Sequence, residues 1–250
     1  MTNTADTKFW AVVPAAGVGS RMRADLPKQY LPLRDRTVIE HTLHRLSLIS
    51  ELSGIVVAVA ENDPWWHKLH IDIAKPIIVA KGGAERCHTV QNALAALNGK
   101  AQDNDWVLVH DAARPCVQPG DLHTLIRTLS AHPTGGLLGV PVRDTMKRTD
   151  TDNQIQATVD RNHLWHALTP QMFRFGMLQQ ALQKALDDEV LVTDEASAME
   201  YAGYQPIMVE GCGDNIKITR PEDLALAGFY IDHQTTQGLL GYRDGMDDGG

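Results

Sequence analysis

One stretch, residues 14–29, constrains the fold of this chain more than any other. It reads PAAGVGSRM at 14–22 and PKQ at 27–29, and it follows an apolar run, 9–13, that is typical of a buried strand. Small residues let the backbone of such a loop come close to a ligand. Gly17 and Gly19 permit backbone angles that other residues resist. The pattern therefore predicts a strand that ends in a ligand-binding loop.

Two cations follow the glycines of this loop. Arg21 offers a planar fork of donors, and Lys28 carries a compact charge beside Pro27, which restrains the backbone. Successive amide N–H groups in a small-residue loop form a concavity that binds anions. Together the amides and the two cations predict a cradle for a triphosphate.

Three other interpretations of the loop have to be weighed. A dinucleotide-binding fingerprint would have a third small residue where Met22 stands, and a Walker loop would end in Gly-Lys-Ser/Thr, which is absent here. The third alternative is an ordinary strand-to-helix connection with solvated cations. Arg21 together with Lys28 makes this last interpretation less favoured than phosphate binding.

Short apolar runs alternate with helical patterns along the chain. This alternation is typical of right-handed crossovers, so we predict an α/β fold: a doubly wound, mostly parallel, Rossmann-like sheet with helices on both faces. Ligands of such sheets bind beyond the carboxyl ends of the strands. Thr37 with Glu40 and Thr219 with Glu222 match capping boxes at helix starts. The predicted strands are 9–13, 54–60, 77–80, 106–109, 136–142, 207–209 and 216–218, and the predicted helices are 37–49, one from 63, 85–97, 121–129, 175–186, 194–201 and 219–231.

The segment 144–161 departs from this alternation. It is polar and charged, with turn residues at 150–153 between two extended pieces, so we predict a projecting β-hairpin arm. A polar hairpin is marginally stable alone, which favours packing on a second subunit and hence a homodimer; a mobile surface excursion is the alternative. We expect a single nucleotide-binding domain over 1–233. The tail over 234–250 is rich in glycine, and we expect it to be disordered.

Composition excludes several classes of protein. The net charge of −8 argues against nucleic acid as a partner, although a local cationic cleft can still bind a small anion. The three cysteines are far apart and form no CxxC pair, which is typical of reduced thiols in a cytoplasmic protein. No segment is apolar enough to span a membrane. Three pairs of histidines at a spacing of three lack acidic or cysteine partners, which disfavours a zinc site.

Further candidate residues follow later strands. Gly82 and Gly83 stand between a strand and the helix that holds Thr89, where backbone could meet a base or ribose; an ordinary turn is the alternative. Asp111 and Arg114 come just past the strand 106–109. Asp111 is suited to a divalent cation that also touches phosphates, and an internal ion pair between these two residues is the alternative.

Six further motifs follow the first loop along the chain. They are HDAARP at 110–115, PVRDTMK at 141–147, VDR at 159–161, ALTPQ at 167–171, TDEA at 193–196 and DNIK at 214–217. Together with the first loop, these motifs resemble those of the 2-C-methyl-D-erythritol 4-phosphate cytidylyltransferase family. The first loop alone is shared by many nucleotidyltransferases, so the later motifs carry the specificity, and the resemblance covers about 9–232. Ala84 departs from the family pattern, in which we expect an acidic residue.

The resemblance implies transfer of CMP from CTP to methylerythritol phosphate, with Mg²⁺ as cofactor and a homodimer completed by the arm. It implies catalytic roles for Arg21, Lys28, Arg161 and Lys217, and Asp111 and Asp214 are expected either to help hold the metal or to contact substrate. The second substrate is expected to contact Asp111, Arg114, Thr145, Arg161, Thr169, Asp214 and Lys217. The nucleotide pocket is expected to include Pro14, Ala15, Ala16, Gly17, Gly19, Arg21, Lys28, Gly82, Gly83, Thr89, Asp111, Ala112 and Arg114.

Other functions remain open at this point. A sugar-1-phosphate nucleotidyltransferase would use the same loop with a different base, and a nicotinamide-dependent reductase would use a related fold. A non-catalytic nucleotide-binding regulator is the third alternative. Both cations and both aspartates are present in this chain, which disfavours the regulator.

Overall fold

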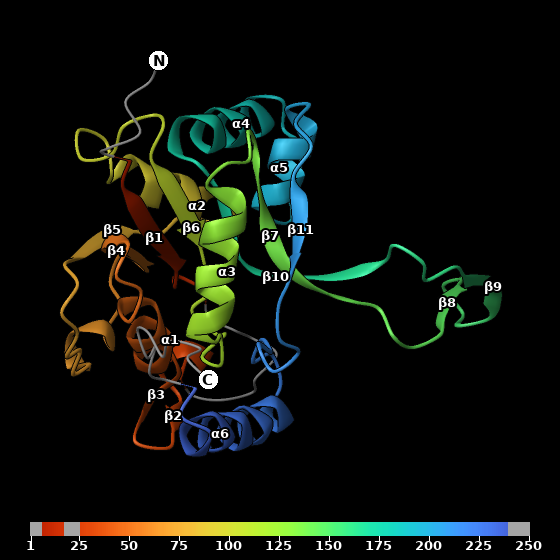
Figure 1. The fold of residues 1–250 in the computed structure, drawn as a ribbon, viewed down its shortest axis with the longest axis horizontal. Helices are drawn as coiled ribbons and strands as arrows, with labels where there is room; N and C mark the ends of the chain where they lie inside the picture. Colours follow the sequence, from red (N-terminus) through yellow and green to blue (C-terminus); the bar gives the residue numbers. More distant parts are fainter. Residues whose placement is uncertain (1–6, 18–25, 240–250) are drawn as a thin grey trace, which may run out of the picture.

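The computed structural model describes residues 7–17 and 26–239 and shows one central sheet flanked by helices (Figure 1). Six strands run parallel to one another, while β10 is antiparallel to its two neighbours, β6 and β7. The predicted α/β class with a mostly parallel sheet is therefore confirmed. In sheet order the strands are β11 (Ile207–Glu210), β7 (Gly135–Pro141), β10 (Trp165–Arg174), β6 (Trp106–Val109), β1 (Phe9–Pro14), β4 (Leu52–Val59) and β5 (Ile77–Lys81).

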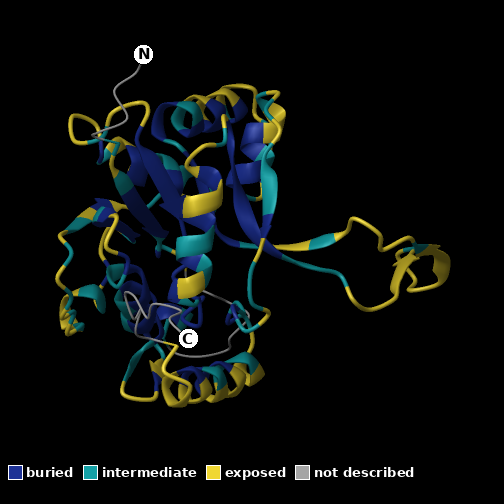
Figure 2. Ribbon diagram, in the orientation of Figure 1, coloured by how far each residue is buried: buried dark blue, intermediate teal, exposed yellow. Residues whose placement is uncertain are grey.

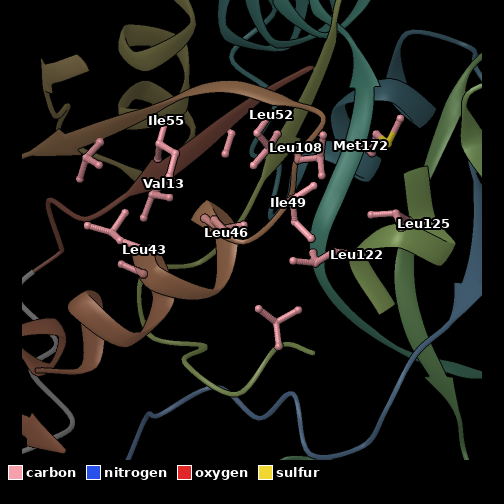
Figure 3. Close-up of a cluster of buried hydrophobic side chains, with 14 of the residues drawn as sticks. Val13, Leu43, Leu46, Ile49, Leu52, Ile55, Leu108, Leu122, Leu125 and Met172 are labelled. Carbon is pink, nitrogen blue, oxygen red and sulfur yellow. The ribbon is translucent and has the colours of Figure 1, made fainter. Parts of the chain in front are cut away.

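The two faces of the sheet carry different helices because side chains alternate along each strand. Ala11 and Val13 of β1 pack with the first face, whereas Trp10 and Val12 pack with the second. Helices α1 and α3 cover the first face, whose core is drawn in Figure 3, and α2, α4 and α5 cover the second. These helices are α1 (Val38–Ser47), α2 (Arg86–Ala95), α3 (Pro119–Leu129), α4 (Phe175–Asp187) and α5 (Glu195–Tyr201).

A third, smaller core lies below the sheet. There α6 (Pro221–Thr236) packs on the two-stranded ribbon β2 (Pro32–Leu33) and β3 (Arg36–Thr37), and Ala227 and Ile231 of the helix are buried against it. The predicted capping box at Thr37 is confirmed: its N–H donates to Glu40 Oε2 at 2.7 Å. This box starts α1 directly after β3 and so ties the small core to the large one.

Several predicted elements differ in the structure. Asp63 does not begin an α-helix: its Oδ1 accepts the N–H groups of Trp65 and Trp66, and only a 3-10 turn, Trp66–Lys68, follows. The segment 216–218 forms no strand, although the N–H of Ile218 donates to Ala113 O at 2.9 Å. At the start of α6, the capping carboxylate is that of Asp223 and not that of Glu222, because its Oδ2 accepts from the backbone of Thr219 and Arg220.

The strand β10 is the main element that the sequence pattern did not predict. Pro170 interrupts the apolar run, and a residue without an N–H argues against a central strand. The pairing with β7 is in fact irregular between Ala167 and Gln171. Beyond that point Met172 and Phe173 continue the ladder with β6 on one side and β7 on the other.

The predicted arm is a hairpin that projects from the body (Figure 1) and is largely exposed (Figure 2). Its strands are β8 (Met146–Thr149) and β9 (Ile155–Val159), and the turn is held by Asp150, whose Oδ1 accepts the N–H groups of Asp152 and Gln154. The arm leaves the sheet from the end of β7 and returns at the start of β10.

The predicted start of the tail at Gln234 is wrong. Helix α6 continues to Thr236, and Gln234 is buried, with Nε2 donating to Cys116 O at 2.9 Å and to Asp214 Oδ2 at 2.6 Å. Residues 240–250 lie outside the described part of the chain. Among the helices that are described, none combines the length and the apolar character needed to cross a bilayer.

Strand β7 begins at a position that only glycine tolerates. Gly135 has φ +108°, and a Cβ there would lie 2.2 Å from the carbonyl oxygen of Met172 in β10. We expect Gly135→Ala to lower the free energy of unfolding by about 2–4 kcal/mol, through left-handed backbone strain and overpacking. Urea unfolding measures this change.

The matched control is Gly120→Ala in α3, where an added Cβ meets no atom within 4 Å. Alanine is the better helix former, so this variant should be stable or slightly more stable than the parent. Equal stability of the two alanine variants would contradict the packing described for β7 and β10.

Candidate active site

A cleft of about 280 Å³ opens at the carboxyl ends of β1, β5 and β6, where sheets of this kind bind ligands. It brings together segments that are far apart in the sequence. Residues from the sequence prediction that line it are Pro14, Ala15, Ala16, Gly17, Lys28, Gly83, Thr89, Asp111, Ala112 and Lys217; Gln29, Ala84, Glu85, Arg86 and Ala113 line it as well.

The loop after β1 is stabilised by the side chain of Gln29, which the sequence analysis did not include among the site residues. Gln29 is buried, and its Nε2 donates to Ala15 O at 2.7 Å and to Gly17 O at 3.1 Å. The opposite wall comes so close that Gly82 has no room for a side chain: a Cβ there would lie 2.2 Å from that of Ala16. The two loops therefore form a narrow, shaped wall. Gly19 and Arg21, both predicted to bind nucleotide, lie outside the described residues.

The glycine loop after β5 shapes the cleft mainly through its own internal hydrogen bonds. The N–H of Gly82 donates to Val59 O at 2.7 Å, and that of Gly83 donates to Thr89 Oγ1 at 3.0 Å. Ala15 likewise donates its N–H to Ala58 O at 2.7 Å. These three amides hold the loops together, and Thr89 positions the glycine loop from the first turns of α2.

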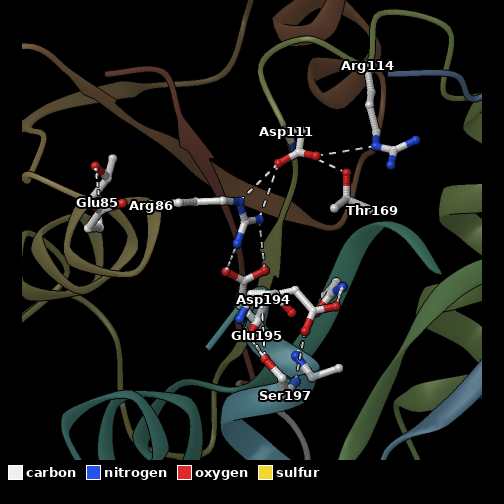
Figure 4. Close-up of polar contacts among 12 residues, drawn as sticks. Glu85, Arg86, Asp111, Arg114, Thr169, Asp194, Glu195 and Ser197 are labelled. Carbon is white, nitrogen blue, oxygen red and sulfur yellow. Dashed lines mark hydrogen bonds and ion pairs between the residues drawn. The ribbon is translucent and has the colours of Figure 1, made fainter. Parts of the chain in front are cut away.

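Asp111 is the charged centre of the cleft. Its carboxylate lies 3.2 Å from Arg86 Nη2, 3.3 Å from Arg114 Nε and 3.0 Å from Lys217 Nζ. Burial alone would raise the pKa of Asp111, but the three cations outweigh burial and hold this pKa well below its ordinary value. The carboxylate is therefore ionised at neutral pH and orients three cations at once. Figure 4 shows two of them, Arg86 and Arg114, beside Asp111.

The structure places two lysines on the cleft. Lys217 reaches it from the segment before α6, and Lys28 from the 3-10 turn Lys28–Tyr30. Lys28 Nζ donates to Ile218 O at 2.8 Å, so the lysine ties its own turn to the segment that carries Lys217. Two ammonium groups beside a small-residue loop make this a site suited to phosphates.

His110 and Thr169 form a support beneath Asp111. Burial lowers the pKa of His110 to about 4, so the ring is neutral at physiological pH. Its Nδ1 lies 2.9 Å from Thr169 Oγ1, which also accepts the N–H of Asp111 at 3.1 Å, and its Nε2 lies 3.1 Å from Arg114 O. Thr169 thus fixes the backbone of Asp111 and does not itself line the cleft.

Arg86 is a site residue that the sequence analysis missed. It bridges Asp111 and Glu195, with Nη1 and Nη2 at 2.6 and 3.0 Å from the two carboxylate oxygens of Glu195 (Figure 4). Burial opposes the charge of Arg86, but the two carboxylates together raise its pKa. The TDEA motif at 193–196 was a signal for Glu195. The signal for Arg86 was its place at the start of the helix after the glycine loop.

Other predicted residues lie away from the cleft lining. Arg114 is buried behind Asp111, with Nη1 donating to Asn215 O at 2.7 Å. Thr145 and Arg161 are exposed residues of the arm, and Arg161 donates to Arg143 O there. The arm projects from the body of the molecule (Figure 1). Within one chain the arm therefore carries both residues away from the body.

The expected metal ligands, Asp111 and Asp214, do not form a joint site. Asp111 already faces three cations, while Asp214 Oδ2 accepts from Gln118 at 2.7 Å and Gln234 at 2.6 Å, between α3 and α6. The described ranges hold no cluster of three or more His, Cys, Asp or Glu side chains suited to a metal ion. The protein residues described here therefore do not fit a preformed metal cage.

Arg86→Met would remove the cation that Asp111 and Glu195 share. Glu195 is only 1% exposed, so we expect a loss of about 3 kcal/mol in the free energy of unfolding at pH 7. Burial already raises the pKa of Glu195 despite Arg86, and the variant raises it further. A raised folded-state pKa means that the folded form binds the proton more tightly, so the loss should shrink as the pH falls through that pKa.

Urea unfolding at pH 7 and at pH 5 measures both effects. Lys100→Met, which removes an exposed cation after α2, is the control and should change little. A loss that grows on acidification would contradict the assigned pairing.

Comparison with known proteins identifies the family of this chain. A family model described as 2-C-methyl-D-erythritol 4-phosphate cytidylyltransferase matches residues 9–233. A protein of that name from Vibrio vulnificus (strain YJ016) is 54% identical over 228 residues, which cover 91% of this chain and 96% of the relative. One from Pseudomonas aeruginosa is 55% identical over 225 residues, or 90% and 96% of the two chains.

Solved structures give the same result. The crystal structure of the Francisella tularensis protein of that name has a TM-score of 0.77 and 36% identity, and the match covers 90% of this chain and 100% of that chain. A crystal structure described as 4-diphosphocytidyl-2C-methyl-D-erythritol synthase has a TM-score of 0.79 and 37% identity, over 91% and 100% of the two chains. The match of the family model to most of the chain and the identity to these relatives show that this chain belongs to the 2-C-methyl-D-erythritol 4-phosphate cytidylyltransferase family.

Proposed function

We propose that this enzyme transfers CMP from CTP to 2-C-methyl-D-erythritol 4-phosphate, giving 4-diphosphocytidyl-2-C-methyl-D-erythritol and pyrophosphate. The observation that carries this proposal is the cleft in which Lys28 and Lys217 face a narrow small-residue loop around Asp111. The reaction belongs to non-mevalonate isoprenoid precursor synthesis. The free thiols of Cys87, Cys116 and Cys212 support a cytoplasmic location.

The reaction needs no nucleophile from the protein. A phosphate oxygen of methylerythritol phosphate is already an anion at neutral pH, and it attacks the α-phosphorus of CTP while the bond to the bridging oxygen of pyrophosphate breaks. The protein must hold two anions in line and stabilise charge on the α-phosphate and the leaving group. We assign this stabilisation to Lys28 and Arg21, and binding of the attacking phosphate to Lys217.

Asp111 acts in this scheme by holding Lys217 and Arg86 in place. An ionised carboxylate 3.0 Å from Lys217 Nζ keeps the ammonium at the edge of the cleft before substrate arrives. Preorganised charge is worth more than charge that must reorient during the reaction. Mg²⁺ is the cofactor that we propose, with oxygens of the triphosphate as its main ligands, because the described carboxylates form no cage.

We further propose that the arm of a second subunit completes the site. Arg161 and Thr145 are carried away from the cleft of their own chain, and Ile155 on the arm is 66% exposed. An apolar side chain on a polar hairpin is suited to burial against a partner. A homodimer would place the Arg161 guanidinium, a bidentate phosphate binder, beside the cleft of its partner.

Pyrophosphate release from each of the four nucleoside triphosphates tests the function directly. We expect release with CTP and Mg²⁺ only when methylerythritol phosphate is present, with much less from UTP and least from ATP and GTP. A preference for UTP with a sugar 1-phosphate would contradict the proposal and favour a sugar-nucleotide transferase. Release without any phosphate acceptor would contradict it as well.

Lys28→Met tests the role of the first lysine. Loss of a cation that stabilises charge in the transition state should lower kcat by about a hundredfold or more. Loss of its hydrogen bond to Ile218 O should lower the free energy of unfolding by only about 0.5–1.5 kcal/mol. Steady-state kinetics at saturating CTP and Mg²⁺ provide the measurement. The control is Lys68→Met, which changes an exposed lysine that does not line the cleft. A kcat near that of the parent would rule out the assigned role.

Deletion of residues 149–156 tests the shared site. We expect monomers in sedimentation experiments and weaker binding of methylerythritol phosphate, whereas CTP binding should persist because its cleft forms within one chain. Asn153→Gly is the control, since glycine accepts the φ of +63° at that turn position and keeps the hairpin. A monomeric deletion variant with unchanged affinity for the second substrate would contradict completion by the arm.

A further inference from the structure

A second cavity, of about 500 Å³, is lined by residues of α1, of α6 and of the turn between β2 and β3. Figure 1 shows these elements below the central sheet. It shares no lining residue with the catalytic cleft. Its lining is rich in cationic groups: three arginines, Arg34, Arg36 and Arg45, and two histidines, His41 and His44. None of these residues has a part in the reaction proposed above.

Arg45 is the unusual member of this group. Its side chain belongs to α1 and is only 1% exposed, yet within the described residues its guanidinium has no hydrogen bond and no ion pair, and Nη1 is completely enclosed. A buried cation without a partner costs several kcal/mol, so proteins pair such groups or place them where a ligand supplies the counter-charge.

The two acids of the cavity are already occupied by the other arginines. Asp232 of α6 accepts hydrogen bonds from Arg34 Nε, at 2.9 and 3.0 Å, and from Arg34 Nη2, at 2.7 Å. Asp35 lies 3.5 Å from Arg36. The charge of Arg45 is therefore the one that the lining does not balance.

The pKa values of Arg45 and of the two histidines also reflect this lack of negative charge. Burial lowers the pKa of Arg45 to about 10, and the more distant Cys116 and Asp214 compensate only in part. The pKa values of His41 and His44 are also lowered, first by burial and then by neighbouring arginines. Both imidazoles are thus neutral at physiological pH and can gain a proton when a negative charge arrives.

We propose that this cavity binds the phosphate group of a small anionic ligand through Arg45, with Arg36 and the two histidines around it. The part of the Arg45 guanidinium that lines the cavity can donate a charge-assisted hydrogen bond to a phosphate oxygen, and nearby imidazoles suit an anion that carries more than one charge. The ligand class is free phosphate, pyrophosphate or a small phosphorylated metabolite. The volume of the cavity is sufficient for each of these.

The test is calorimetric titration with inorganic phosphate at constant ionic strength. It uses the full chain with Lys28→Met and Lys217→Met, so that the two lysines of the catalytic cleft do not contribute. We expect saturable binding, weakened tenfold or more by the added change Arg45→Met and less by Arg45→Lys. Arg127→Met, an exposed arginine on α3, is the matched control and should bind as the background does.

Thermal unfolding separates binding from folding. Without phosphate, Arg45→Met should be at least as stable as its background because it removes an unpaired buried charge, whereas a structural role for Arg45 would make this variant less stable. Phosphate should raise the Tm of the background and not that of Arg45→Met. If Arg45→Met does not fold, the same comparison of Tm with and without phosphate is made with two other variants. Arg45→Lys changes the buried guanidinium, and Arg36→Gln removes another cation of the cavity lining.

Further titrations identify the source of the phosphate group. Pyrophosphate or glycerol 3-phosphate binding more tightly than phosphate would support the proposal and select the larger ligand. Equal heats from chloride and phosphate, tighter binding of citrate than of any phosphate, or undiminished binding by Arg45→Met would overturn it.

Discussion

The ion-pair cluster around Asp111 is the interaction on which the rest of the site depends. One carboxylate, buried at the end of β6, holds Arg86 from α2, Arg114 from its own loop and Lys217 from the segment before α6. Three cations this close would repel one another without the central anion. The cluster therefore joins helix, loop and sheet, and it places one ammonium at the cleft where the substrates meet.

The support of this cluster is neutral and buried, which suits its task. His110 and Thr169 fix the backbone of Asp111 through hydrogen bonds that need no charge. Glu195 forms a second ion pair with Arg86. The charges that face the cleft are thus backed by two groups, His110 and Thr169, that are neutral at physiological pH. This arrangement gives an acidic protein a local cationic site, because the excess of negative charge lies elsewhere on the chain.

Local pattern predicted the strands β1, β4, β5 and β6 and the loop that follows β1, because hydrophobic periodicity and glycine chemistry act over a few residues. It also found Lys28, Asp111 and Lys217, which the fold brings to one cleft. It failed where a residue depends on a distant partner. Arg86 and Gln29 look ordinary in sequence and gain their roles from Glu195 and from the carbonyl of Ala15, more than ten residues away.

Strand β10 was hidden for a similar reason, and its position bears on how the protein is made. Strand β7 pairs with β10 and β11 and not with β6, so β6 remains an open edge until the ribosome has delivered residue 174. The hairpin and some 60 residues after β6 must be synthesised before that edge is covered. During this interval the apolar strand β6 has no partner strand on that side, and an unpaired strand edge can pair with another chain. Because of this order of synthesis, the central strand β6, and not an edge strand of the finished sheet, is the part that most needs protection from aggregation.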